Sequence, residues 1–161
     1  MLKGNYITQV KLDDVIDRKV IISYIKSQGD TLWISTRGRG LVSYNTKTGK
    51  CHIYRNMYDD SNVQLSNMLW QTEVSSSGEL LICTDKGLCI KDKSSDKFTN
   101  YIFNKENPSD NRCCTLCEFE DGIFLVGTYG HGVVAFDLNK RKFVDFEGNS
   151  SINELDILSL I

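Results

Sequence analysis

Two short stretches of this 161-residue chain carry side chains that could do chemistry. The first is TRGRG (36–40), in which arginines alternate with glycines. It could be a phosphate-binding loop, an RNA-binding arginine-glycine segment or a tight turn. The second is the pair Cys114 and Cys117, which has the spacing of redox or zinc-binding cysteines. Which chemistry is available depends on the elements that carry these residues.

The cysteine pair does not fit a zinc site. Zinc would need a second pair or suitably spaced histidines, and the chain has only His52 and His131. Residues 113–119 have the pattern of a strand, on which Cys114 and Cys117 would point to opposite faces. Since free cysteine often packs as a small buried hydrophobe, we expect isolated thiols, no metal site and no cofactor.

The elements around TRGRG recur along the chain. The segment LWISTRGRGLVSY (32–44) aligns with LLICTDKGLCIK (80–91) and FLVGTYGHGVVAF (124–136). Each reads as an apolar strand ending in threonine, a short turn closed by glycine and a second strand. A phosphate-binding loop would lead into a helix, and RNA-binding arginine-glycine segments are low-complexity. We therefore interpret these stretches as turns, whose glycines permit the bend. The turn glycines are Gly38, Gly40, Gly87, Gly130 and Gly132.

Further strands flank each of these units. Those expected before the units cover residues 20–29, 68–78 and 113–122. Those expected after them lie in residues 49–54, 96–101 and 141–146. Four short strands thus recur about every 45 residues, which is typical of propeller blades. We predict an all-β partial β-propeller of about three four-stranded antiparallel blades, an open fragment of a larger propeller.

The repeat also predicts how the chain is divided. We expect the end of a preceding blade or a connection at 1–19, blade 1 at 20–66, blade 2 at 67–111, blade 3 at 112–150 and the start of a further blade at 151–161. Propellers typically close with 4–8 blades, so three would leave apolar faces uncovered. We expect these faces to contact the remainder of a propeller in a longer parent chain, or to drive self-association.

The repeats resemble two-component regulator propeller repeats. The best match to that pattern covers residues 33–45, from Trp-Ile-Ser-Thr through Gly-Leu to Tyr-Asn. The second unit departs from it with Leu81 in place of tryptophan and Lys91 in place of an aromatic residue, whereas the third keeps Gly-Thr, Gly and Phe-Asp within 127–137. The resemblance covers about residues 20–146. In this family such repeats build the periplasmic sensor region of hybrid two-component histidine kinases.

The resemblance implies a ligand-sensing fragment of such a sensor. It would recognise an oligosaccharide or another small ligand and relay the signal to a kinase that this chain does not contain. The sequence has no phosphoacceptor-histidine motif and no ATP-binding glycine boxes, so we expect no enzyme activity. Two alternatives remain open: a propeller scaffold for protein–protein interaction, and a carbohydrate-active enzyme.

The turns between the second and third strands are the candidate ligand-binding positions. Their residues differ between units on a shared scaffold, and such loops commonly carry binding groups. Arginine offers forked donors to carboxylate or sulfate, tyrosine a flat stacking surface, and histidine can donate or accept. The candidates are Arg37, Arg39, Asp85, Lys86, Tyr129 and His131. Trp33 is expected to pack in the core, and Trp70 either to be buried between blades or to approach the channel.

Charge and hydropathy limit the partners further. The formal net charge is −2, whereas dedicated nucleic-acid binders usually carry a basic excess. The sequence contains neither an N-terminal apolar run typical of a secretory signal nor a run of 18 apolar residues. We expect no nucleic-acid partner and no membrane segment in this chain, and the family resemblance implies a periplasmic location.

Overall fold

The computed structural model describes residues 12, 19–56, 65–145, 157 and 159. These residues form three four-stranded antiparallel sheets, each made of strands that follow one another in the chain. The first sheet contains β1 (Ile21–Gln28), β2 (Thr31–Arg37), β3 (Leu41–Asn45) and β4 (Cys51–Tyr54). The second contains β5 (Leu69–Val74), β6 (Leu80–Thr84), β7 (Gly87–Lys91) and β8 (Phe98–Tyr101). The third contains β9 (Cys113–Glu120), β10 (Ile123–Thr128), β11 (Val133–Asp137) and β12 (Lys142–Val144).

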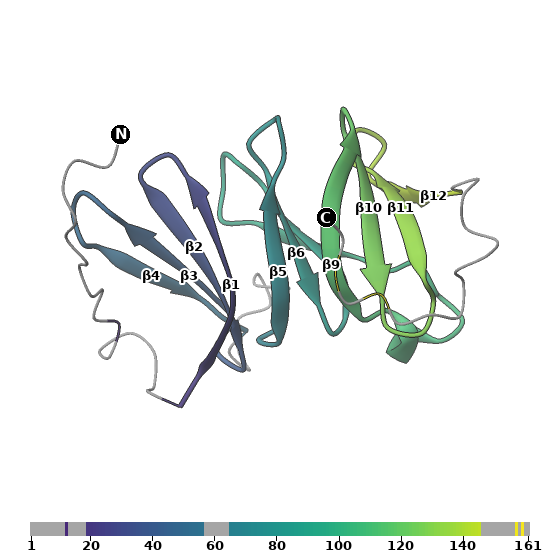
Figure 1. Ribbon diagram of the computed structural model, residues 1–161, viewed down its shortest axis with the longest axis horizontal. Helices are drawn as coiled ribbons and strands as arrows, with labels where there is room; N and C mark the ends of the chain where they lie inside the picture. The colour runs from purple at the N-terminus through teal and green to yellow at the C-terminus, as the bar shows by residue number, and fades with distance from the viewer. Residues whose placement is uncertain (1–11, 13–18, 57–64, 146–156, 158, 160–161) are drawn as a thin grey trace.

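The sheets stand side by side, as the blades of a propeller do (Figure 1). Their first strands are neighbours, because β1 packs against β5 and β5 against β9. A short 3-10 helix, η1 (Pro108–Asp110), lies in the connection from the second sheet to the third. The prediction of an all-β partial propeller with three four-stranded sheets is confirmed.

The middle sheet is buried on both faces. Every residue of β6 and β7 is buried, because the first sheet covers one face of the middle sheet and the third covers the other. The consecutive residues Leu81 and Ile82 on β6 belong to different core clusters, as the alternation of side chains along a strand requires. Burial of each such side chain favours folding by about 1.5–3 kcal/mol.

Two apolar layers join the three sheets. Between the first and second sheets, Trp33 and Leu41 pack with Ile82 and Phe98. Between the second and third, a larger cluster combines side chains from both sheets: Leu81, Leu88, Ile90, Leu116, Phe124, Val126 and Phe136. On the side of the first sheet that faces away from the second, Ile34 and Val42 are buried, whereas β1 is more open. On this side of β1, Ile22 is 45% exposed and Ile25 is 53% exposed.

The expected ends of the chain fall mostly outside the described residues. In the segment 1–19, only Leu12 and Lys19 are described, and in the segment 151–161 only Ile157 and Ser159. The backbone N–H of Ile157 donates to the carbonyl of Thr128 at the end of β10, at 3.0 Å.

Candidate functional site

The turns that follow β2, β6 and β10 are built in the same way. Each begins at a fully buried threonine: Thr36, Thr84 or Thr128. The hydroxyl of each threonine donates to the carbonyl of the glycine that closes its turn, at 2.7, 2.8 and 2.9 Å respectively. The same hydroxyl accepts a backbone N–H from within the turn, at 3.1, 3.0 and 3.2 Å. The repeated threonine therefore holds the turn closed from inside.

The closing glycine is required at two of these turns. Gly40 and Gly87 have φ angles of +78° and +120°, a region that other residues rarely adopt. A Cβ atom on Gly40 would lie 2.2 Å from the carbonyl oxygen of Tyr54, and one on Gly87 would lie 2.3 Å from that of Tyr101. In the first and second sheets the fourth strand thus passes too close for any side chain at this position.

The three turns lie at the same edge of the sheets, which we call the turn face. In Figure 1, β6 and β10 point to this edge, at the bottom of the view, where η1 also lies. The first turn contacts the chain that enters the second sheet, because the N–H groups of Gly38 and Gly40 both donate to the carbonyl of Asn67, at 2.8 and 3.1 Å. Neighbouring sheets therefore share backbone contacts at the turn face.

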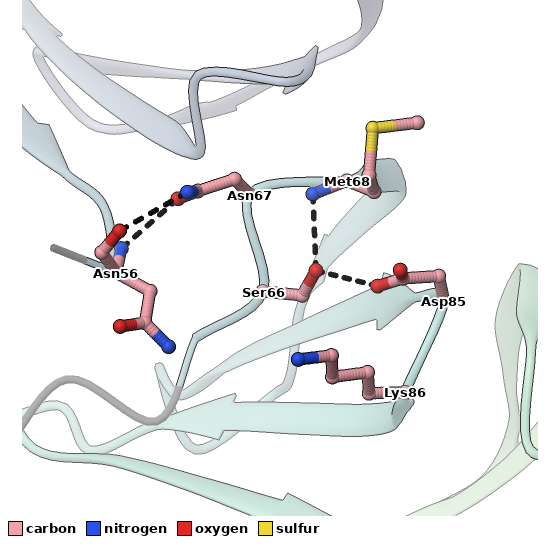
Figure 2. A pocket seen from close by; sticks show the side chains of 6 residues that line it. All are labelled: Asn56, Ser66, Asn67, Met68, Asp85 and Lys86. Atoms are coloured by element: carbon pink, nitrogen blue, oxygen red, sulfur yellow. Dashed lines mark hydrogen bonds between the residues drawn. The ribbon is translucent and has the colours of Figure 1, made fainter. Parts of the chain in front are cut away.

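An open recess of about 360 Å³ lies on the turn face between the first and second sheets. Its lining residues are Asn56, Ser66, Asn67, Met68, Asp85 and Lys86. Figure 2 shows that hydrogen bonds fix most of this wall: Ser66 donates to Asp85 and accepts from the Met68 N–H, while Asn56 and Asn67 bond to each other. The Lys86 ammonium points into the recess without such a bond in this view.

Beside the recess, four side chains from all three sheets form an alternating row of cations and rings. The Arg37 guanidinium lies 5.6 Å from the centre of the Trp70 ring. The Arg112 guanidinium lies 5.7 Å from the same ring and 4.8 Å from the Tyr129 ring. Cation–π attraction operates at such distances. We call Arg37, Trp70, Arg112 and Tyr129 the arginine–aromatic row.

The row combines a fixed centre with accessible ends. Trp70 is half-buried on β5 and packs against the core between the second and third sheets. Arg37, Arg112 and Tyr129 are exposed, Tyr129 to 50%. The arrangement offers guanidinium donors and an aromatic face to a ligand that lies across the ends of several strands.

The structure brings together some of the sequence-based site candidates and separates others. Arg37 and Tyr129 belong to the row, through Trp70 and Arg112, and Asp85 and Lys86 line the recess.

The other two candidates take part in neither group. Arg39 is exposed at the tip of its turn. His131 lies 3.5 Å from the Asp110 carboxylate and edge-on to Phe103.

Sequence reasoning missed Arg112. The Tyr129 N–H donates to the Arg112 carbonyl, just as the Asp85 N–H donates to that of Met68. Arg112 thus occupies in the third sheet the place of Met68 in the second. The repeat alignment began at Cys113, and starting it one residue earlier would have included Arg112. Trp70 was singled out, but the side chains around it are distant in sequence and no local pattern indicates them.

The cysteines take part in packing. Within the described residues no group of three or more metal-binding side chains occurs, and the six cysteines, all of them described, form no disulfide with one another. Burial raises the pKa of Cys83, Cys89 and Cys113, so these thiols stay protonated at neutral pH. Cys114 is buried and Cys117 is partly exposed. A nucleophilic or metal-binding role needs a thiolate, which burial disfavours at these three positions.

Comparison with known proteins gives matches among solved structures. No family model matches the chain, and no curated protein matches it. The extracellular domain of a hybrid two-component system from B. thetaiotaomicron superposes with a TM-score of 0.66 and 26% sequence identity over 78% of this chain. This chain is similar to the sensor domains of two-component systems. The resemblance seen in the repeats is thereby confirmed.

Other solved structures share the fold. The extracellular domain of a one-component system from the same organism has a TM-score of 0.63 at 20% identity and covers 75% of this chain. A computationally designed protein, Ika4, has a TM-score of 0.60 at 8% identity, with 84% of this chain and 78% of that chain covered. These two matches support the architecture alone.

The match is to part of a larger domain. This chain spans 18% of the length of the hybrid-system domain and 16% of the one-component domain. Both neighbours are extracellular domains of signalling systems. In the part of this chain that the structure describes, no helix is long and apolar enough to cross a membrane.

Proposed function

We propose that the chain is part of the ligand-sensing propeller of a periplasmic two-component sensor and that its turn face binds an oligosaccharide. The observation that carries this proposal is the arginine–aromatic row, on a scaffold similar to the extracellular domain of a hybrid two-component system. Sugar rings stack on exposed aromatic faces and their hydroxyls accept from guanidinium groups. In this proposal the three sheets are consecutive blades, and the boundaries between the blades are those that the sequence repeat predicts.

Signal relay follows from the position of the row. Its four residues come from three sheets, so a ligand that contacts all of them favours one arrangement of the sheets over others. A ligand can shift such an equilibrium only by its difference in affinity for the two states. In the longer parent protein, that shift would be passed to a kinase outside this chain.

The open side of β1 supports a second part of the proposal. Ile22 and Ile25 are 45% and 53% exposed, and neighbouring exposed apolar residues mark contact surfaces. We place the remainder of the propeller in the parent chain against this surface. For the isolated chain, the same surface favours self-association.

The test is calorimetric titration of the purified chain with a panel of neutral and acidic oligosaccharides, with thermal unfolding followed in parallel. We expect at least one oligosaccharide to release or absorb heat and to raise Tm, because a ligand that binds only the folded state stabilises it. If no glycan gives heat of binding or raises Tm, and a protein partner binds in a defined stoichiometry, the chain acts as a protein-interaction scaffold and not as a ligand sensor. Hydrolysis or elimination of a bound glycan would indicate the enzyme reading.

A further inference from the structure

The two arginines of the row contact aromatic rings and, among the described residues, no carboxylate. Elsewhere, lysines or arginines form ion pairs with carboxylates, as in Lys47–Asp30 at 2.7 Å and Lys91–Asp96 at 3.1 Å. Among the described residues, neither Arg37 nor Arg112 forms an ion pair with a carboxylate. Their described partners are aromatic rings. Two positive charges are therefore held at one site without neutralisation by the described part of the chain.

The row holds both charges beside one ring. The two guanidinium groups lie 5.6 and 5.7 Å from the centre of the Trp70 indole. The ring attracts each of them and limits their side-chain motion. Anionic groups that bind these arginines would find their donors already oriented, which reduces the entropy lost on binding.

The ends of the row indicate what else the ligand carries. The Tyr129 ring is 50% exposed and lies beside Arg112, at 4.8 Å. A pyranose ring stacked on Tyr129 would place a charged substituent near Arg112. A small inorganic anion would leave this aromatic surface unused, whereas a charged sugar uses both features.

We propose that the arginine–aromatic row selects an anionic oligosaccharide, with carboxylate or sulfate groups bound by Arg37 and by Arg112 and a sugar ring on Tyr129. This inference rests on the proposed function and specifies the chemical class of its ligand. Arginine binds both carboxylate and sulfate through two parallel N–H donors. The shared chemistry is therefore an oxyanion on a sugar.

The test titrates the full chain with three oligosaccharides of matched length: an oligogalacturonide, the corresponding neutral galacto-oligosaccharide, and a chondroitin sulfate oligosaccharide. We expect one or both acidic sugars to bind at least about tenfold more tightly than the neutral one, as expected for charge-assisted hydrogen bonds. High salt should weaken the acidic sugar more than the neutral one. Preference for the oligogalacturonide identifies the group as carboxylate. Preference for the chondroitin sulfate sugar identifies it as sulfate if the unsulfated chondroitin oligosaccharide, which keeps the carboxylates, binds no better than the neutral sugar.

Three variants separate the row from general charge. Arg37→Gln and Arg112→Gln should each abolish most of the preference for the acidic sugar, because they weaken binding of the acidic sugar far more than that of the neutral one, while leaving Tm nearly unchanged. The matched control is Lys47→Gln, which removes one positive charge from the turn between β3 and β4, and it should keep the preference.

Other outcomes would overturn the inference. If neutral and acidic sugars bind equally well, the selection of anions is wrong while oligosaccharide sensing stands. If polyglutamate of matched charge competes as well as the oligogalacturonide, the row recognises charge without a sugar, and the inference fails. If no oligosaccharide binds at all, both this inference and the proposed function fail.

Discussion

The indole of Trp70 and the guanidinium of Arg37 face each other at 5.6 Å although they belong to different sheets. Trp70 lies on β5, and Arg37 is the last residue of β2. An isolated bridge between Arg37 and Met68 brings the two strands together at this point. The contact therefore exists only when the first and second sheets are packed, which makes it sensitive to their relative position.

The buried threonine hydroxyls should contribute to stability. In Thr84→Val the carbonyl of Gly87 and the N–H of Lys86 each lose a hydrogen bond to a fully buried hydroxyl. We expect a loss of about 1–3 kcal/mol in the free energy of unfolding, typical of buried polar groups left unsatisfied. Chemical denaturation measures it. Thr84→Ser keeps the hydroxyl and should lose clearly less. Equal losses for valine and serine would mean that the hydroxyl contributes no more than the methyl group that serine lacks.

Two glycine substitutions should differ in their cost. Gly87→Ala places a Cβ 2.3 Å from the Tyr101 carbonyl oxygen and strains a φ of +120°. In Gly130→Ala the φ is +87° but no atom lies within 4 Å of the new Cβ. We expect about 1–2 kcal/mol for Gly130→Ala, from the left-handed backbone alone, and a larger loss for Gly87→Ala. Thermal unfolding of both variants tests this, and similar Tm values would contradict the close approach of β8.

The repeat made much of this architecture predictable. Thr36, Thr84 and Thr128 recur because each turn needs the same internal hydroxyl, and the closing glycine follows because the fourth strand passes close by. Such constraints act within one sheet and therefore repeat in the sequence.

Contacts between sheets were not predictable in the same way. Lys91 replaces the aromatic residue of the repeat, and its ammonium lies 5.9 Å from the Trp33 ring and 5.6 Å from the Tyr54 ring of the first sheet. The contact of Trp70 with Arg112 in the arginine–aromatic row likewise joins neighbouring sheets. These contacts depend on how far one sheet is displaced against the next, which the repeat does not encode.

Acidification should destabilise the chain. The side-chain and backbone hydrogen bonds from Lys140 lower the pKa of Asp137, and those from Ser94 lower the pKa of Asp92. For Asp96, burial acts to raise the pKa, but the hydrogen bond and charge of Lys91 outweigh it, so this pKa is also lowered. A carboxyl group with a lowered pKa stabilises the folded state above its unfolded value, about 3.9 for aspartate. That contribution is lost as the pH falls through the lower, folded value.

Unfolding measured between neutral pH and about pH 3, a range that spans the ordinary aspartate pKa, tests this expectation. Stability should be nearly constant above pH 5 and should fall below about pH 4. Asp96→Asn should be less stable than the parent chain at neutral pH, because Lys91 is buried and loses its ion pair. The difference between the two proteins should shrink on acidification. A constant difference at every pH would mean that the charge of Asp96 has no part in it.

The exposed side of β1 should control association. Ile22→Lys together with Ile25→Lys places two charges on residues that are 45% and 53% exposed. If the isolated chain self-associates through this surface, the double variant should remain monomeric at concentrations where the parent chain does not, since like charges oppose contact. Sedimentation velocity measures this. The control Lys47→Ile adds an isoleucine on the exposed turn between β3 and β4. If this variant associates more strongly than the parent chain, the number of exposed isoleucines controls association, and the assignment of the contact to β1 is wrong.

The tryptophans allow ligand binding to be observed at the row itself. The chain has two, Trp33 and Trp70. Trp33 is buried in the core and donates its indole N–H to Gln28 at 2.9 Å, so Trp33→Phe leaves Trp70 as the single reporter. An oligosaccharide that binds the row should change the emission of Trp70 with the same affinity as calorimetry gives, because it displaces water and moves the adjacent guanidinium groups. In Trp70→Phe, where Trp33 remains, the same titration should leave the emission nearly unchanged. A glycan that binds by calorimetry without altering the Trp70 signal would have its site elsewhere on the chain.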